Sequence, residues 1–532
     1  NSRQTLTFDC DWQLKLPRPI AGQKQVSVET GQQARIPIQL DLPARLAPGA
    51  YELSARVRFA DGQEQTDRFT IDVIAPPRIP GMRALALFDP LGQTEAALEE
   101  LGIDFRRVQA DSELRPDEIL AIGKLALTVD GPGPDLSRVR DGLKVIVFEQ
   151  SPEVLQKRLG FRVNEYGLRQ IFARIPDHPA LAGITAEQLH DWRGDATTLP
   201  PRMAFESKPR YGPMVNWNGI ELPHIWRCGN RGDVASALIE KPARGDFRPI
   251  LDGGYSLQYS PLMEFRQGKG LIVFSQLDAI GRTETEPAAM SLICNILRYV
   301  DGWKPEPSRN AVYLGDAAGR AHLASSGVKL NPYDGGDLKP SEQVLILAPG
   351  ESEKLVAAAP AIARFISGGG HVLALGLDQD EITASLPTKV ILKKSEHIAA
   401  SFAPPRVRSI FVGIGPADVY NRGPRQIPLV TNAATVLGDG VLASDATGNI
   451  VFDQLIPWQF DYRKEYNLKR MYRRSSFTLT RALGNLGVAM ETPMLEWFHT
   501  PPKGGGDDHR WLNGLYLDAP EEWDDPYRFF RW

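Results

Sequence analysis

Two related stretches decide the fold of this chain: GLIVFSQL at residues 270–277 and GNIVFDQL at residues 448–455. In each, a short apolar run stands between a glycine and polar residues, which is typical of a strand buried on both faces. A helical pattern follows each stretch and ends near residues 295–297 or 484–486. Buried strands that alternate with helices favour a parallel sheet with helices on both faces. The recurrence predicts that one α/β unit occurs twice.

Matching elements on either side of these stretches delimit the two copies. The matched strands are predicted at 83–88, 124–129 and 143–148 in the first copy, and at 311–314, 344–347 and 371–375 in the second. We expect the two copies at residues 82–303 and 308–490. A tail at 491–532 follows, with Trp497, Trp511, Trp523 and Trp532. These aromatic residues are predicted either to anchor an interface with a neighbouring subunit or to cover the chain's own core.

Residues 1–77 have a different pattern, in which apolar and polar residues alternate. The alternating stretches lie at 25–29, 34–40, 51–59 and 68–74, with glycine and proline turn signals between them. The part from residue 48 to residue 73 resembles the last strands of an immunoglobulin-like bacterial module, which implies a β-sandwich. A proline-rich linker at 75–81 ends this domain. The predicted fold class is therefore multidomain: an immunoglobulin-like β-sandwich and then two α/β flavodoxin-like domains.

Composition excludes several classes of function. The chain has 532 residues and a net charge of −4, so it carries no basic footprint for nucleic acid. No apolar run is long enough to predict a membrane span. The three cysteines, Cys10, Cys228 and Cys294, lie far apart and predict neither a disulfide framework nor a zinc site. The chain starts with Asn-Ser, so we expect a processed or excised polypeptide, and we predict a periplasmic or extracellular location.

The segment 145–152 resembles the strand and turn that carry the nucleophile in class I glutamine-amidotransferase-like domains. In active members of that family a cysteine stands at this turn, where a helix N-terminus lowers its pKa. Here Glu149 occupies that position, and the histidine expected after the last strand is absent, with Gln276 and Asp278 there instead. The corresponding turn of the second copy, at 375–379, also lacks a nucleophile. Amidotransferase activity is therefore not predicted for either copy.

Four carboxylates of the first α/β copy are candidates for glycoside hydrolysis: Glu240, Asp252, Glu264 and Asp278. That reaction needs two carboxyl groups about 5–5.5 Å or about 6.5–9.5 Å apart across a sugar. Sequence does not measure these separations, so the alternative of ordinary surface charge stays open, above all for Glu240 and the adjacent Lys241.

Candidate substrate-binding residues are Trp217, Trp226 and Arg231, since an indole ring can stack on a sugar. The alternative is a buried tryptophan with a polar partner. No phosphate-binding loop, HExxH motif or dinucleotide fingerprint occurs, so no cofactor and no metal are predicted.

A second resemblance covers most of residues 82–532. The segments 229–242, 247–249, 259–264 and 268–278, together with the tail at 516–532, are similar to the C-terminal regions of large bacterial β-galactosidase-like glycoside hydrolases of families two and forty-two. The resemblance implies that an amidotransferase-like domain lies behind a catalytic (β/α)₈ barrel and builds the oligomer. Such a barrel needs about 250 residues, and the duplicated α/β unit leaves no room for one here.

The functional prediction is a non-catalytic, carbohydrate-associated scaffold or the accessory region of a glycoside hydrolase, which supports oligomer assembly or a sugar-binding site. Its predicted partners are a carbohydrate and either further copies of this chain or a larger glycoside hydrolase assembly. An active β-galactosidase-like glycoside hydrolase, using carboxylates of the first α/β copy or of its interface with the second, is the alternative. An envelope assembly protein is a further alternative.

Overall fold

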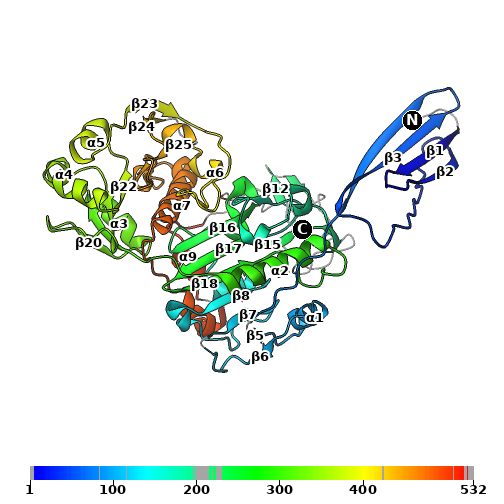
Figure 1. Cartoon of the computed structure of the whole chain (residues 1–532), viewed down its shortest axis with the longest axis horizontal. Coiled ribbons are helices and arrows are strands. Elements are labelled where there is room, and N and C mark those ends of the chain that lie inside the picture. Colours follow the sequence, from blue (N-terminus) through cyan, green and yellow to red (C-terminus); the bar gives the residue numbers. More distant parts are fainter. Residues whose placement is uncertain are drawn as a thin grey trace. The chain divides into compact units, whose positions relative to one another are not determined.

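The computed structural model describes residues 5–82, 84–115, 117–195, 198, 215–217, 220–222, 231–421, 425–506, 508–520 and 524. The chain divides into two compact units, Asn1–Arg78 and Ile79–Trp532, and the division falls inside the predicted linker. Figure 1 shows the elements of both units in sequence colours. Sheets and helices together make this a multidomain α/β protein.

The described part of the N-terminal unit forms one antiparallel sheet of four strands in the order β2-β1-β3-β4. The strands are β1 (Leu6–Leu14), β2 (Ile20–Val28), β3 (Gly49–Phe59) and β4 (Glu64–Val73). Three of the four predicted strands are confirmed. The fourth, at 34–40, pairs with no other strand in the described range, because Pro37 in its middle has no N–H to donate to a ladder. Within residues 5–78 no second sheet faces the first, which corrects the prediction of a two-sheet sandwich for this range.

The larger unit contains two lobes, and the first lobe (residues 84–303) is built on a ten-stranded mixed sheet. Its main order is β10-β16-β17-β18-β8-β7-β5-β6, with β15 joining β17 to β9. The strands are β5 (Leu85–Phe88), β6 (Arg106–Arg107), β7 (Ile119–Ile122), β8 (Lys144–Val147), β9 (Val163–Leu168), β10 (Phe172–Ala173), β15 (Ala235–Glu240), β16 (Asp246–Gly253), β17 (Tyr259–Gln267) and β18 (Gly270–Ser275). The five strands from β18 to β6 are parallel, as predicted, and the others add an antiparallel half.

The second strand of the first copy was predicted at 124–129, and this prediction is wrong. The strand is β7, which ends at Ile122, and Leu125 has a left-handed backbone that no strand allows. Gly123 directly follows the strand, and a Cβ there would lie 2.6 Å from the Asp89 carboxyl group, so a larger residue would have to displace Asp89.

Each face of the first sheet is covered by different elements. Alternate residues of the parallel strands pack against α1 (Gln93–Glu100) and α2 (Pro287–Gly302) on one face. The residues between them pack on the other face against the π-helical turn Val154–Arg158 and against α8 (Met494–His499) of the tail. A short helix, α9 (Arg510–Asn513), follows in the tail. The described tail therefore covers the chain's own core, with Trp497 packed against it, whereas Trp523 and Trp532 lie outside the described residues.

The second lobe (residues 308–490) repeats the parallel arrangement with seven strands in the order β20-β19-β21-β22-β27-β26-β25. The strands are β19 (Asn310–Leu314), β20 (Leu330–Pro332), β21 (Gln343–Leu347), β22 (His371–Leu375), β25 (Thr435–Leu437), β26 (Leu442–Ser444) and β27 (Ile450–Asp453). The first five in this order are parallel, and their chain connectivity matches that of β6-β5-β7-β8-β18. Two copies of one strand arrangement are thus present.

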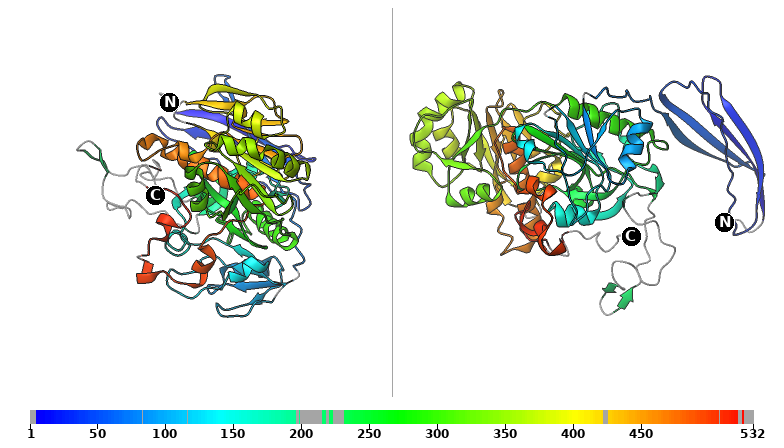
Figure 2. Two further views of the ribbon diagram at one scale, coloured as in Figure 1. Left: turned by 90° about the vertical axis from the view of Figure 1, so that its left-hand side faces the viewer. Right: turned by 90° about the horizontal axis from the view of Figure 1, so that it is seen from below.

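Helices cover both faces of this second sheet. One face packs against α4 (Ser352–Ser367) and α5 (Gln379–Ser385), and the other against α3 (Ala317–Ser325) and α7 (Lys469–Asn485). Figure 2 shows α7 in orange between the two lobes, where it also contacts β16. Among the described residues the remaining α-helix is α6 (Pro416–Val419). The remaining strands form the hairpin β23 (Leu392–His397) with β24 (Arg425–Val430), and the short pairs β11 (Trp192–Asp195) with β14 (Arg231–Gly232) and β12 (Val215–Trp217) with β13 (Ile220–Leu222).

Replacing Gly160 by alanine is expected to lower the free energy of unfolding by about 2–3 kcal/mol, measured by urea denaturation. Gly160 has φ +73°, and an added Cβ would lie 2.2 Å from the ring of Trp497 in the tail. The left-handed backbone costs about 1–2 kcal/mol, and the forced displacement of the ring adds the rest. Gly183 has φ +74° and open space around it, so Gly183→Ala is the control and loses only the backbone contribution. Equal losses in both variants would contradict tight packing of Trp497 on the first lobe.

Candidate functional site

The four candidate carboxylates come from neighbouring strands, yet none of them faces solvent. Glu240 ends β15, Asp252 lies in β16, Glu264 lies in β17, and Asp278 follows β18. Their exposed fractions are 4%, 5%, 0% and 0%. Ordinary surface charge is therefore the wrong interpretation of Glu240 and of Lys241, which is 4% exposed. A buried carboxylate needs a cationic or hydrogen-bonding partner, and the partners define what each group does.

Asp252 belongs to a buried cluster where the two lobes meet, which we call the junction cluster: Arg174, Lys241, Asp252 and Asp418. Arg174 binds Asp252 at 2.6 Å and also Asp418, which lies in α6 of the second lobe. The Lys241 Nζ atom lies 2.8 Å from Asp252 and 3.9 Å from Asp418. Burial lowers the pKa of Lys241; it opposes ionisation of Asp418 too, but Arg174 and Lys241 bring the pKa of Asp418 below its usual range. Two cations thus balance two anions.

Glu240 takes part in a second group of charges that joins three parts of the chain. Its Oε1 atom lies 3.1 Å from the Nε atom of Arg473 in α7. Arg473 and Arg162 also bind Asp518 of the tail, at 2.5 and 2.8 Å. Burial raises the pKa of Glu240, although both arginines act against this. The tail, the first lobe and the second lobe are held together at this point.

Glu264 lies inside the first lobe and is held by hydrogen bonds. Its Oε1 atom is 2.9 Å from Nε2 of His178 and accepts the Tyr299 hydroxyl at 2.5 Å. Burial alone would raise the pKa of Glu264, but the bond from His178 and the charge of Arg248 hold it well below its usual range. His178 also accepts the N–H of Ala180 through its Nδ1 atom and so caps the short helical turn that follows it. A carboxylate held ionised in this way is not suited to donate a proton.

Asp278 and Glu149 lie at the carboxyl edge of the first sheet, where the amidotransferase resemblance would place a nucleophile. Glu149 is fully buried and accepts the backbone N–H groups of Ala279 and Ile280 at 2.8 and 2.9 Å. Burial raises its pKa to about 7, against the charge of Lys124. Asp278 accepts a hydrogen bond from Ser236 and lies 3.9 Å from Arg282. Glu149 therefore closes this edge and presents no reactive group outward.

The crevices where open α/β sheets usually bind ligands are also filled by the chain itself. Such ligands lie at the carboxyl ends of strands, where the strand order reverses; the reversal falls between β5 and β7 and between β19 and β21. At the first, Asp89 accepts the N–H groups of Thr94 and Glu95 at 2.7 and 2.9 Å. At the second, Asp316 accepts the N–H of Gly319 at 2.7 Å. These carboxylates occupy the helix N-termini that would otherwise attract an anion.

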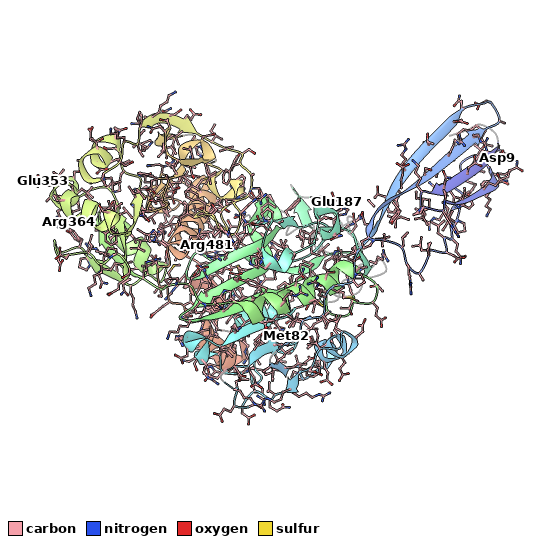
Figure 3. All side chains as sticks on the ribbon, viewed as in Figure 1. Asp9, Met82, Glu187, Glu353, Arg364 and Arg481 are labelled. Atoms are coloured by element: carbon pink, nitrogen blue, oxygen red, sulfur yellow. The ribbon has the colours of Figure 1, made fainter. Side chains whose placement is uncertain are left out.

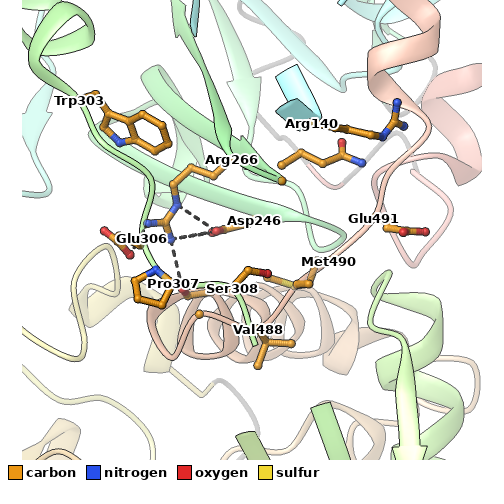
Figure 4. Close-up of a pocket in the computed structure, with 15 residues that line it drawn as sticks. Arg140, Asp246, Arg266, Trp303, Glu306, Pro307, Ser308, Val488, Met490 and Glu491 are labelled. Carbon is orange, nitrogen blue, oxygen red and sulfur yellow. Dashed lines mark hydrogen bonds and ion pairs between the residues drawn. The ribbon is translucent and has the colours of Figure 1, made fainter. Parts of the chain in front are cut away.

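A pocket of about 210 Å³ opens between the lobes. Figure 4 shows its lining, which includes Arg140, Asp246, Arg266 and Trp303 of the first lobe, residues 487–490 of the second, and Glu491 at the start of the tail. Arg266 binds Asp246 at 2.9 Å, and Arg481 of α7 binds the same carboxylate at 2.7 Å. Arg481, labelled in Figure 3, is fully buried where the lobes meet. None of the four candidate carboxylates lines this pocket.

The three substrate-binding candidates lie largely beyond what the structure describes. Trp217 and Arg231 belong to β12 and β14, and Trp226 lies outside the described residues, as does Cys228. Cys10 and Cys294 are buried free thiols. In the described ranges no cluster of three or more His, Cys, Asp or Glu side chains is arranged to hold a metal ion. No helix in the same ranges is long and apolar enough to cross a membrane.

Sequence reasoning missed the cations of these networks, namely Arg162, Arg174, Arg473 and Arg481. One feature of the sequence pointed to these networks: the arginines of α7 recur at spacings of three, four and seven residues, in a helix that is polar on average. That spacing places Arg470, Arg474 and Arg481 along one side of the helix, which would suit a row of acidic partners. Comparison with protein-family models finds no match for this chain, and no curated protein matches it either.

Proposed function

We propose that this chain is a non-catalytic, carbohydrate-associated scaffold or the accessory region of a glycoside hydrolase, which supports oligomer assembly or a sugar-binding site. One observation carries the proposal: every candidate carboxylate is buried and bound by the chain's own cations, hydroxyls or imidazole. Glycoside hydrolysis needs an acid and a second carboxylate on either side of a sugar. Each candidate carboxylate is at most 5% exposed, and none of the four lines the pocket between the lobes, so no two of them face a shared space for that sugar.

The same networks support a role in assembly, because they join the parts of the α/β unit into one body. Asp252 reaches Asp418 of the second lobe through Arg174, and Asp518 links the tail to both lobes. Removing one partner from such a buried pair is strongly destabilising, so the lobes keep their arrangement. A rigid two-lobed body is suited to support a neighbouring domain. A periplasmic or extracellular location remains a prediction from the sequence.

The test is an assay of the purified chain on a panel of aryl glycosides, beside Glu240→Gln, Glu264→Gln and Asp278→Asn. We expect no turnover above the buffer rate by any of the four proteins. Turnover by the parent that one of these substitutions abolishes would contradict the scaffold and support the glycoside hydrolase. Light scattering tests the assembly role: we expect an oligomer, and a strict monomer would contradict both scaffold assembly and envelope assembly.

A further inference from the structure

The pocket between the lobes contains a polar side chain that the chain itself does not satisfy. Gln267 ends β17, lines the pocket and is only 6% exposed. Its Oε1 atom accepts no hydrogen bond from any described residue. A buried carbonyl oxygen without a donor is unfavourable, so a bound molecule that offers a hydroxyl or an N–H group would be favoured here.

The charged groups around the pocket are already neutralised by one another. Arg266 binds both Asp246 and Glu306, the latter at 2.7 Å. The remaining pairs are Asp246 with Arg481, Arg140 with Glu496, and Glu491 with Lys329, at 2.7, 2.5 and 2.7 Å. Because each of these groups already has an oppositely charged neighbour, a charged ligand would have to compete with one of these pairs. The electrostatics therefore favour a neutral ligand.

Trp303 adds an aromatic surface to this polar wall. It follows the last residue of α2, packs against the core of the first lobe and stays partly exposed in the pocket lining. In Figure 4 its indole ring and Arg140 lie on either side of Arg266. An indole face beside hydrogen-bonding groups is suited to a ring that carries C–H bonds on its face and hydroxyls on its edge.

We propose that the pocket between the lobes binds a neutral, polyhydroxylated ring of monosaccharide size, with Trp303 against the ring face and Gln267 accepting a hydroxyl. The pocket volume of about 210 Å³ is below the roughly 300–1,000 Å³ of sites for drug-sized molecules, which limits the ligand to a single ring. This inference rests on the proposed carbohydrate association, since it gives that function a site. It requires no catalysis.

The experiment is isothermal titration calorimetry of the full chain with glucose, galactose and mannose, and with the uronate and the amino sugar of each as charged analogues. We expect saturable one-to-one binding of at least one neutral sugar, and at least about tenfold weaker binding of its charged analogue. Trp303→Ala and Gln267→Leu should each weaken binding by about tenfold, the effect of losing one stacking or hydrogen-bonding contact.

Gln258→Leu is the matched control. Gln258 is 7% exposed and its amide also lacks a partner among the described residues, but it does not line the pocket; its variant should bind as the parent does. Trp303→Phe, which keeps an aromatic face, should recover part of the affinity and guards against misfolding of the alanine variant. Absence of saturable binding by every neutral sugar, or binding unaffected by both pocket substitutions, would overturn the inference. Neither outcome changes the glycoside turnover or the oligomeric state, which test the scaffold itself.

Discussion

Arg174→Met is expected to lower the free energy of unfolding of the α/β unit by about 3–5 kcal/mol, because it leaves two buried carboxylates with one cation. Arg174 is 2% exposed and binds Asp252 and Asp418, and only Lys241 of the junction cluster would remain to them. Methionine keeps most of the side-chain volume, so the lost free energy of unfolding measures the effect of the unpaired charge rather than that of a cavity. The measurement is urea denaturation at neutral pH, followed by intrinsic fluorescence.

Arg169→Met is the matched control for this prediction. Arg169 pairs with Asp191, but the two side chains are 65% and 48% exposed. A pair this exposed contributes at most about 1 kcal/mol, so the variant should unfold close to the parent. The double variant Arg174→Met, Asp418→Asn should recover part of the loss, since one unpaired charge is removed. A loss below about 1 kcal/mol for Arg174→Met would show that the junction cluster does not hold the lobes together.

Asp453→Asn is expected to raise the free energy of unfolding at pH 8 by ~4 kcal/mol. Asp453 ends β27 and is 1% exposed; its Oδ1 atom accepts the N–H of Leu455, while Oδ2 has no hydrogen-bond partner in the described ranges. Burial raises the pKa of Asp453 from 3.8 to about 7, which corresponds to ~4 kcal/mol. Asparagine keeps the shape and the acceptor without the charge.

The sign of this effect gives it a characteristic dependence on pH. The folded chain keeps the Asp453 proton up to about pH 7, whereas the unfolded chain releases it near pH 3.8. The stability that the parent protein has with Asp453 protonated is therefore fully present below pH 3.8, and it is lost as the pH rises through 7. The difference between variant and parent should grow from near zero at pH 4 to its full value at pH 8, measured by urea denaturation at each pH.

Asp380→Asn, in the exposed first turn of α5, is the control. An exposed substitution of this kind changes stability by no more than about 0.5 kcal/mol. A difference for Asp453→Asn that stays flat between pH 4 and pH 8 would contradict a buried carboxylate without a second partner.

The parallel strands were predictable because they are short apolar runs that need no partner to be recognised. β8, β18, β19, β21, β22 and β27 all lie where the pattern predicts them. The antiparallel half of the first sheet was not predicted, since β16 and β17 contain Asp246, Arg248, Asp252, Glu264 and Arg266. Charged residues in a strand usually face solvent, and here every residue of both strands is buried. Their partners lie up to 235 residues away along the chain, as for Asp246 and Arg481.

The candidate site, like the fold, could be predicted from the sequence only in part. Sequence alone selected Glu240, Asp252, Glu264 and Asp278 as notable acids, and it found no nucleophile at either turn. It did not determine whether these acids face a sugar or a cation, because this depends on Arg473, Arg174, His178 and Arg282, which other segments supply.

What the sequence determined by itself is the repeated α/β unit and the change of pattern near the linker, because both depend on local hydrophobic periodicity. What only the tertiary structure decided is the environment of each charge. The ionisation and accessibility of a carboxylate depend on burial and on the nearest cation. Both arise when distant segments pack: α7 of the second lobe and the tail bring Arg473 and Asp518 to Arg162 and Glu240 of the first lobe.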